Sequence, residues 1–127
     1  MKREKKRFLL VEDFEDCRFM MRRLLEMAGY SVVEATDGEE AVKMAVESRP
    51  ALILMDLSLP KMDGLAATRR IRQQRGLKRV PIVAVSAHDS QESRAEALDA
   101  GCNEYVTKPI DFDRLTDLIQ HFLPADH

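Results

Sequence analysis

Five short apolar segments alternate along this chain with five segments of helical periodicity. The apolar segments are residues 8–11, 31–35, 51–55, 80–85 and 104–107. They are too short to span a membrane, and the runs at 8–11 and 51–55 contain no polar residue, which is typical of strands buried on both faces. Alternation of this kind predicts a parallel sheet with right-handed crossovers and helices on both faces, a doubly wound α/β domain.

The helical segments repeat their apolar residues at steps of three and four positions. The first is expected to end at Gly29 and to direct one apolar face at the core, formed by Cys17, Met20, Met21, Leu24, Leu25 and Ala28. The segment 90–100 has only Ala95 and Leu98 as inward candidates, so we expect it to be among the more mobile elements. Asp111 is the predicted N-cap of the last helix.

The length of the chain limits the number of domains. Its 127 residues are enough for one buried core and too few for an eight-unit βα barrel, which needs roughly twice as many. We therefore expect a single domain over residues 1–127, with the folded core at about 7–123 and a basic N-terminal arm at 1–6.

Charge and cysteine content argue against several functional classes. The 20 basic and 22 acidic residues leave a net charge of −2, which does not favour direct binding to nucleic acid. The apolar run after the basic N-terminus is too short for a signal peptide, and no segment predicts membrane insertion. Cys17 and Cys102 lack the spacing of metal ligands. We expect a cytoplasmic protein with two reduced cysteines.

Polar side chains follow four of the five predicted strands. These are Glu12 and Asp13 after the first strand, Asp56 after the third, Ser86 after the fourth and Lys108 after the fifth. The carboxyl ends of parallel strands share one edge of a sheet, where ligands bind. Three carboxylates brought together there repel one another unless a cation lies between them. A set of oxygen ligands without His or Cys favours Mg²⁺ over Zn²⁺.

This set of residues has the chemistry of a phosphoryl site. Mg²⁺ and Lys108 would neutralise the phosphoryl oxygens, Ser86 would donate a hydrogen bond, and Asp56 would be the nucleophile that forms an aspartyl phosphate. Taken alone, Asp56 is equally consistent with the cap of a local turn, and Lys108 with a solvated lysine beside a turn proline. Because four predicted strands end in polar residues, the phosphoryl site is favoured over these two alternatives.

The same residues resemble the motifs of a known family. Their order and spacing resemble those of response-regulator receiver domains of bacterial two-component signalling. The matching residues are the acidic pair Glu12 and Asp13, the segment 56–64, Ser86 with Ala87, Tyr105, and Lys108 with Pro109. The resemblance covers residues 7–123. It implies the flavodoxin-like strand order 2-1-3-4-5 with five helices, the first and last on one face. With so little chain after the last helix, it also implies a stand-alone, chemotaxis-regulator-like receiver.

The resemblance implies which residues bind the metal. Asp13, Asp56 and the carbonyl of Ser58 would bind Mg²⁺ directly, and Glu12, in place of the more usual Asp, would act largely through water. Asp56 would accept a phosphoryl group from the phosphohistidine of a sensor kinase or phosphotransfer protein, or from a small phosphodonor. The chain would then be a regulatory phosphoacceptor that loses the group slowly, and not a turnover enzyme.

The resemblance also implies a switch. Ser86 and the amide of Ala87 would hold the phosphoryl group, and Lys108 would pair with it beside a cis bond to the following proline. The Ser86 hydroxyl would move and the Tyr105 ring would turn inward, which repacks the face of the fourth helix, fifth strand and fifth helix for a downstream effector. Tyr105 is also consistent with a half-buried strand aromatic. His88 resembles a position that tunes phosphoryl lifetime, or is an exposed, inert histidine.

Three other functional classes fit the sequence less well than a phosphoacceptor. A receiver-like interaction module that works without phosphorylation would not need the full set of acids, hydroxyl and lysine. An aspartate-nucleophile phosphohydrolase usually has a second Asp two residues after the nucleophile, where this chain has Ser58. A nucleotide or flavin binder would have a glycine-rich turn after the first strand, which is absent. A receiver domain excised from a hybrid histidine kinase stays open as an alternative.

Overall fold

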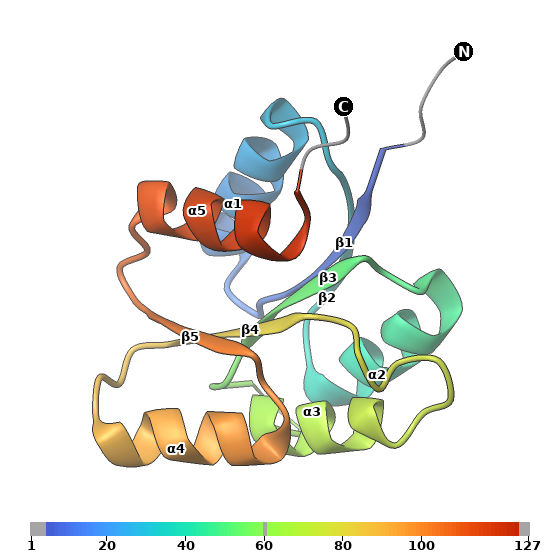
Figure 1. Cartoon of the computed structure of the whole chain (residues 1–127), viewed down its shortest axis with the longest axis vertical. Coiled ribbons are helices and arrows are strands. Elements are labelled where there is room, and N and C mark those ends of the chain that lie inside the picture. Colours follow the sequence, from blue (N-terminus) through green and yellow to red (C-terminus); the bar gives the residue numbers. More distant parts are fainter. Residues whose placement is uncertain (1–4, 60, 125–127) are drawn as a thin grey trace.

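The computed structural model describes residues 5–59 and 61–124. Strands and helices alternate in the predicted order (Figure 1): β1 (Arg7–Val11), α1 (Glu15–Met27), β2 (Ser31–Ala35), α2 (Gly38–Ser48), β3 (Leu52–Asp56), α3 (Gly64–Arg72), β4 (Ile82–Ser86), α4 (Gln91–Ala100), β5 (Glu104–Thr107) and α5 (Phe112–Phe122). β4 begins two residues later than expected. Residues 1–4 of the predicted basic arm, and Pro60 in the turn after β3, lie outside the described residues.

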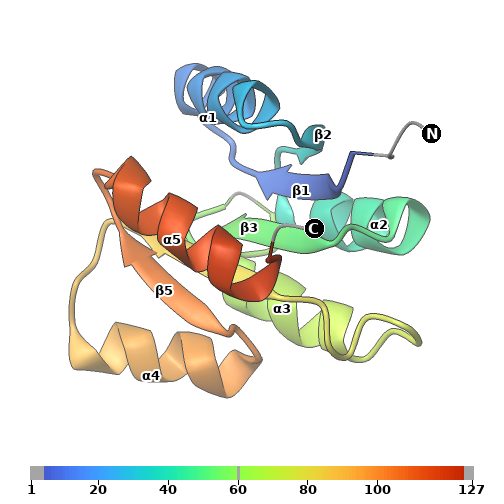
Figure 2. The same cartoon turned by 45° about the horizontal axis from the view of Figure 1, so that its top comes forward.

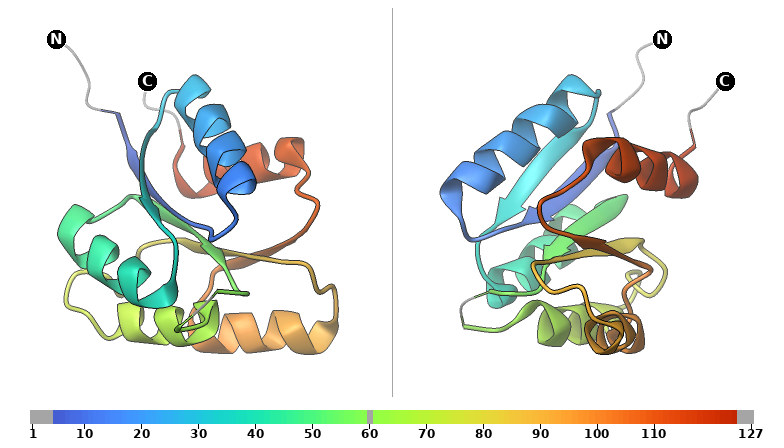
Figure 3. Two further views of the ribbon diagram at one scale, coloured as in Figure 1. Left: turned by 180° about the vertical axis from the view of Figure 1, so that it is seen from behind. Right: turned by 90° about the vertical axis from the view of Figure 1, so that its left-hand side faces the viewer.

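The strands form one parallel sheet in the order β2-β1-β3-β4-β5, which confirms the predicted order 2-1-3-4-5. α1 and α5 cover one face, and α2, α3 and α4 cover the other (Figures 1, 2 and 3). Alternate residues of each strand enter different cores: Phe8 and Leu10 pack under α1 and α5, whereas Leu9 and Val11 pack on the opposite side. The apolar runs are therefore buried on both faces, as a doubly wound sheet requires.

The buried stripe of α1 is narrower than predicted. Met21 and Leu25 are each 4% exposed, but Met20 is 48% exposed and Leu24 37%. The expectation that Met20, Leu24 and Ala28 face the core was wrong, because all three are exposed. Neighbouring positions on a helix point about 100° apart, so a helix lying on a flat sheet buries one i, i+4 pair and leaves the flanking positions near the surface.

The inward face of α4 also differs from the prediction. Ala95 and Leu98 are exposed, with Leu98 at 54%, and Ala97 and Ala100 are buried instead. The alanines lack bulk, so they allow α4 to approach the sheet closely. The prediction based on the one large side chain of the helix was therefore wrong, whereas the expected mobility of α4 stays a prediction.

The turn from β3 into α3 is closely packed against the end of β3. Asp63 caps α3, its side chain accepting a hydrogen bond from the amide of Ala66 at 2.8 Å. Gly64 follows, and a Cβ atom there would overlap the carbonyl oxygen of Asp56. A glycine is required at this position because the backbone of α3 reaches the last residue of β3. The turn therefore holds Asp56 at the edge of the sheet.

The connection from β5 into α5 has two of the expected features. The side chain of Asp111 caps α5 as predicted, accepting bonds from the amides of Asp113 and Arg114. The Lys108–Pro109 peptide bond is cis, as the resemblance implied. None of the described helices has the length and apolar character needed to cross a bilayer.

Candidate functional site

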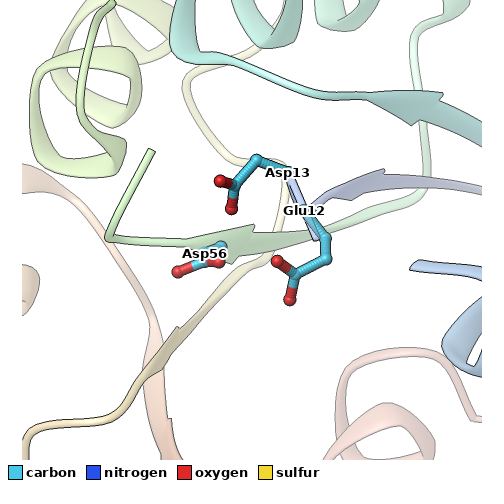
Figure 4. Close-up of side chains that lie close together, drawn as sticks. All are labelled: Glu12, Asp13 and Asp56. Atoms are coloured by element: carbon cyan, nitrogen blue, oxygen red, sulfur yellow. The ribbon is translucent and has the colours of Figure 1, made fainter. Parts of the chain in front are cut away.

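Three carboxyl groups meet where β1 and β3 end. Glu12 and Asp13 directly follow β1, Asp56 is the last residue of β3, and one oxygen from each lies within 4.8 Å of the others (Figure 4). Glu12 is 6% exposed and Asp56 3% exposed, whereas Asp13 is exposed. The predicted convergence of these acids is confirmed. Three carboxylate oxygens at such spacing are suited to bind a hard divalent cation.

Lys108 partly neutralises this acidic cluster. Its Nζ atom donates to Glu12 Oε1 at 3.2 Å and to Asp56 Oδ2 at 3.2 Å. Lys108 is held there because it follows β5, and its amide donates to the carbonyl of Ser86 at 2.8 Å. The ammonium group therefore faces the acids, and the alternative of a solvated lysine beside a turn proline is excluded.

Backbone amides orient the two buried carboxylates. The amide of Ser58 donates to Asp56 Oδ1 at 2.9 Å, and the amide of Phe14 donates to Glu12 Oε2 at 3.1 Å. With the bonds from Lys108, each carboxylate has a partner on both of its oxygens. Asp56 thus caps a local turn through Ser58, and it lies in the acidic cluster as well.

The crowding of charge shifts the acid–base properties of the site. Burial raises the pKa of Glu12, and the hydrogen bond and negative charge of Asp56 raise it further, against smaller opposing effects of the Phe14 amide and Lys108. For Lys108, burial lowers the pKa, but the Asp56 and Glu12 carboxylates outweigh that effect and the net shift is upward. The site therefore favours a cation near Asp56 and disfavours a full set of negative charges.

The hydroxyl and amide predicted beside the acids lie at the end of β4. Ser86 is its last residue and is 2% exposed, and Ala87 follows it at the surface. β4 pairs directly with β3, so that Asp56 is in register with Val85. The Ser86 Oγ atom accepts a hydrogen bond from the amide of His88 at 3.1 Å. The hydroxyl proton can then be donated to a further group.

Tyr105 is buried on the side of the sheet covered by α2, α3 and α4. Its side chain is 2% exposed, and its hydroxyl donates to the carbonyl oxygen of His88 at 2.5 Å. The ring is therefore fully enclosed, and the alternative of a half-buried strand aromatic is wrong. His88 itself is exposed, as is Ser58.

Sequence reasoning missed one side chain that supports the acidic pair. Arg18 on α1 donates through Nη1 to the carbonyl oxygens of Glu12 at 3.2 Å and Asp13 at 3.5 Å. Its Nε atom lies 3.4 Å from Glu34 Oε2 on β2. Arg18 thus connects the loop after β1 to the neighbouring strand. Its position five residues after Asp13, on the first turns of a helix, was the available signal.

Comparison with known proteins identifies the family. The model of the response regulator receiver domain matches residues 8–120. The chain belongs to this family. Receiver domains act in two-component signalling as regulatory phosphoacceptors and not as enzymes. The cluster of Glu12, Asp13 and Asp56 is consistent with the phosphoacceptor site of such a domain.

Individual relatives agree with this assignment. The receiver domain is 35% identical to the polar-differentiation response regulator DivK of Brucella anthropi, over 93% of this chain and 96% of that protein. It superimposes with a TM-score of 0.89 on the receiver domain of a sensor histidine kinase from Pseudomonas aeruginosa. The two are 38% identical, and the match covers 96% of this chain and all of the other. The Pseudomonas structure has a magnesium ion coordinated in its active site cleft. The chemotaxis protein CheY4 of Vibrio cholerae gives the same TM-score at 30% identity, over 94% of this chain and all of the other.

Proposed function

We propose that Asp56 accepts a phosphoryl group from the phosphohistidine of a sensor histidine kinase or phosphotransfer protein in a cytoplasmic phosphorelay. The observation that carries the proposal is the double contact of Lys108 with Glu12 and Asp56 inside a cluster of three acids. An oxygen of Asp56 forms a bond to phosphorus as the bond from phosphorus to the donor imidazole breaks. The imidazole nitrogen keeps the electron pair and takes up a proton.

The residues of the acidic cluster fit Mg²⁺. All the ligands available from Glu12, Asp13 and Asp56 are carboxylate oxygens, which Mg²⁺ prefers. Asp13 and Asp56 would hold the ion directly with the carbonyl of Ser58, and Glu12 would act through water. Bound there, the ion would stabilise negative charge on the transferring oxygens. The Mg²⁺ site of the similar Pseudomonas receiver domain supports this proposal.

The remaining residues would bind the transferred group. Lys108 would pair with a phosphoryl oxygen, because its ammonium group already contacts the acceptor carboxylate. Ser86 and the amide of Ala87 would donate hydrogen bonds to the other oxygens. The Ser86 hydroxyl accepts from His88 in this structure, which leaves its proton for the phosphoryl group.

Phosphorylation would act on partners through Tyr105. Its hydroxyl donates to the carbonyl oxygen of His88, and the His88 amide donates to the Ser86 hydroxyl. His88 therefore connects the Tyr105 side chain to the hydroxyl that would bind the phosphoryl group. A change at Ser86 would then alter the packing around α4, β5 and α5, where an effector protein would bind. Phosphorylation shifts this equilibrium only by bonding better to one arrangement than to the other.

Intact mass spectrometry tests the phosphoacceptor. Incubation with Mg²⁺ and a small phosphodonor is expected to add one phosphoryl group to the native chain and none to Asp56→Asn. Asp16→Asn, an exposed acid outside the cluster, serves as the matched control and should be labelled like the native chain. A native chain that never acquires the group would favour an interaction module that works without phosphorylation. Labelling of Asp56→Asn would identify another acceptor.

A further inference from the structure

Tyr105 is covered by an arginine from α4, a helix that lies alongside β5 (Figures 1 and 2). The guanidinium carbon of Arg94 is 4.9 Å from the centroid of the Tyr105 ring. Arg94 is held in turn by Asp89, whose Oδ1 atom accepts from its Nη2 atom at 2.8 Å. A cation over an aromatic face is attracted by the electrons of the ring.

The same tyrosine is fixed at its other end by the loop that begins α4. Its hydroxyl donates to the carbonyl oxygen of His88, the residue directly before Asp89. Both contacts therefore come from one segment, residues 88–94, which lies between the end of β4 and the first turns of α4. Movement of this segment would change the environment of the ring on its face and at its hydroxyl together.

We propose that Arg94 and Asp89 form a latch that holds Tyr105 in its buried position before any phosphoryl group is bound. Tyr105 is 2% exposed, and its contacts with the Arg94 guanidinium and the His88 carbonyl involve no atom of Asp56. In this receiver domain the burial of Tyr105 therefore depends on the ion pair between Arg94 of α4 and Asp89 of the preceding loop, and not on Asp56 alone. The proposal rests on the proposed switching function, but the latch itself is measurable without phosphorylation.

The latch is tested by observing Tyr105 directly in the unphosphorylated chain. The sequence has two tyrosines and no tryptophan, so ring-labelled tyrosine gives NMR signals from Tyr30 and Tyr105 alone, and Tyr30→Phe assigns them. Arg94→Met keeps much of the side-chain length and removes the charge. It is expected to shift the ratio of buried to exposed Tyr105 about three- to tenfold toward exposed. The Tyr105 signal should then move toward that of a solvent-exposed tyrosine.

Two further variants test the parts of the latch. Asp89→Asn leaves Arg94 in place without its anchor, so a smaller shift in the same direction is expected. Arg94→Lys keeps a cation and should recover part of the native signal. Raising the salt concentration should move the signal of the native chain but not that of Arg94→Met, because the ion pair is exposed and therefore screened.

Arg114→Met is the matched control, because Arg114 donates to the backbone carbonyl of Tyr105 at 3.4 Å and is itself exposed. Its Tyr105 signal should stay native. A native Tyr105 signal in Arg94→Met, or an equal shift in Arg114→Met, would overturn the latch. Phosphorylation of Asp56 is measured separately by mass, so a failed latch and a failed phosphoacceptor give different results.

Discussion

The Nζ atom of Lys108 lies 3.2 Å from Oδ2 of Asp56, although 52 positions separate the two residues in the chain. β4 lies between their strands in the sheet, so the long side chain of Lys108 has to extend across the end of β4 to reach Asp56. The contact supplies positive charge to the most buried acid of the cluster. It also links the acceptor to the β5 end of the sheet, where Tyr105 lies.

Replacing Lys108 with Met should destabilise the chain when Mg²⁺ is absent. The expected loss is about 1–3 kcal/mol, because two buried carboxylates lose their cation while partial solvent access limits the cost. Added Mg²⁺ should recover much of the loss, since the ion neutralises the same acids. Urea unfolding at neutral pH measures both effects. The exposed Lys78→Met should change stability by less than about 0.5 kcal/mol.

The pKa of Glu12 makes stability depend on pH. Because burial and Asp56 raise this pKa above its ordinary value of 4.5, the folded chain binds more protons than the unfolded chain between pH 4.5 and the raised pKa. The stabilising contribution of protonated Glu12 is fully present below pH 4.5 and is lost as the pH rises through that window. Glu12→Gln should remove this part of the pH dependence of the free energy of unfolding, measured without Mg²⁺. The exposed Glu15→Gln should retain it, and parallel curves for native and Glu12→Gln would contradict the prediction.

Mg²⁺ should raise the melting temperature of the native chain. Binding to the folded state alone adds about 2.7 kcal/mol of stability at a concentration one hundred times the Kd. Asp13→Asn removes one carboxylate of the cluster and should need a higher Mg²⁺ concentration for the same shift, followed by thermal unfolding across a Mg²⁺ titration. Asp16→Asn, an exposed acid outside the cluster, should titrate like the native chain. Identical titrations for Asp13→Asn and the native chain would show that the ion does not bind here.

Two adjacent methionines of α1 should differ sharply in their importance for stability. Met21 is 4% exposed and Met20 is 48% exposed. Met21→Ala should cost about 2–5 kcal/mol because it opens a cavity in the core under α1 and α5. Met20→Ala should change stability by less than about 0.5 kcal/mol. Chemical unfolding of both variants measures the difference, and equal losses would mean that α1 packs with a wider face than described.

Much of the fold was predictable because its signals are local. Uninterrupted apolar runs indicate strands buried on both faces, and alternation with helical segments leaves few arrangements other than a parallel sheet. The convergence of Glu12, Asp13 and Asp56 was predictable for the same reason, since residues that end parallel strands share an edge. The order of the strands came from the family resemblance and not from periodicity.

The sequence by itself therefore determined the elements, their order along the chain and the acids at the sheet edge, because those depend on short-range periodicity and on residue type. Only the tertiary structure decided which part of each helical face is buried and which long side chains reach the site. Three sets of contacts join separate elements: those of Lys108 with two acids, of Arg18 with the loop after β1, and of Arg94 with Tyr105. Such contacts depend on the distance and angle at which elements pack, which residue spacing does not specify.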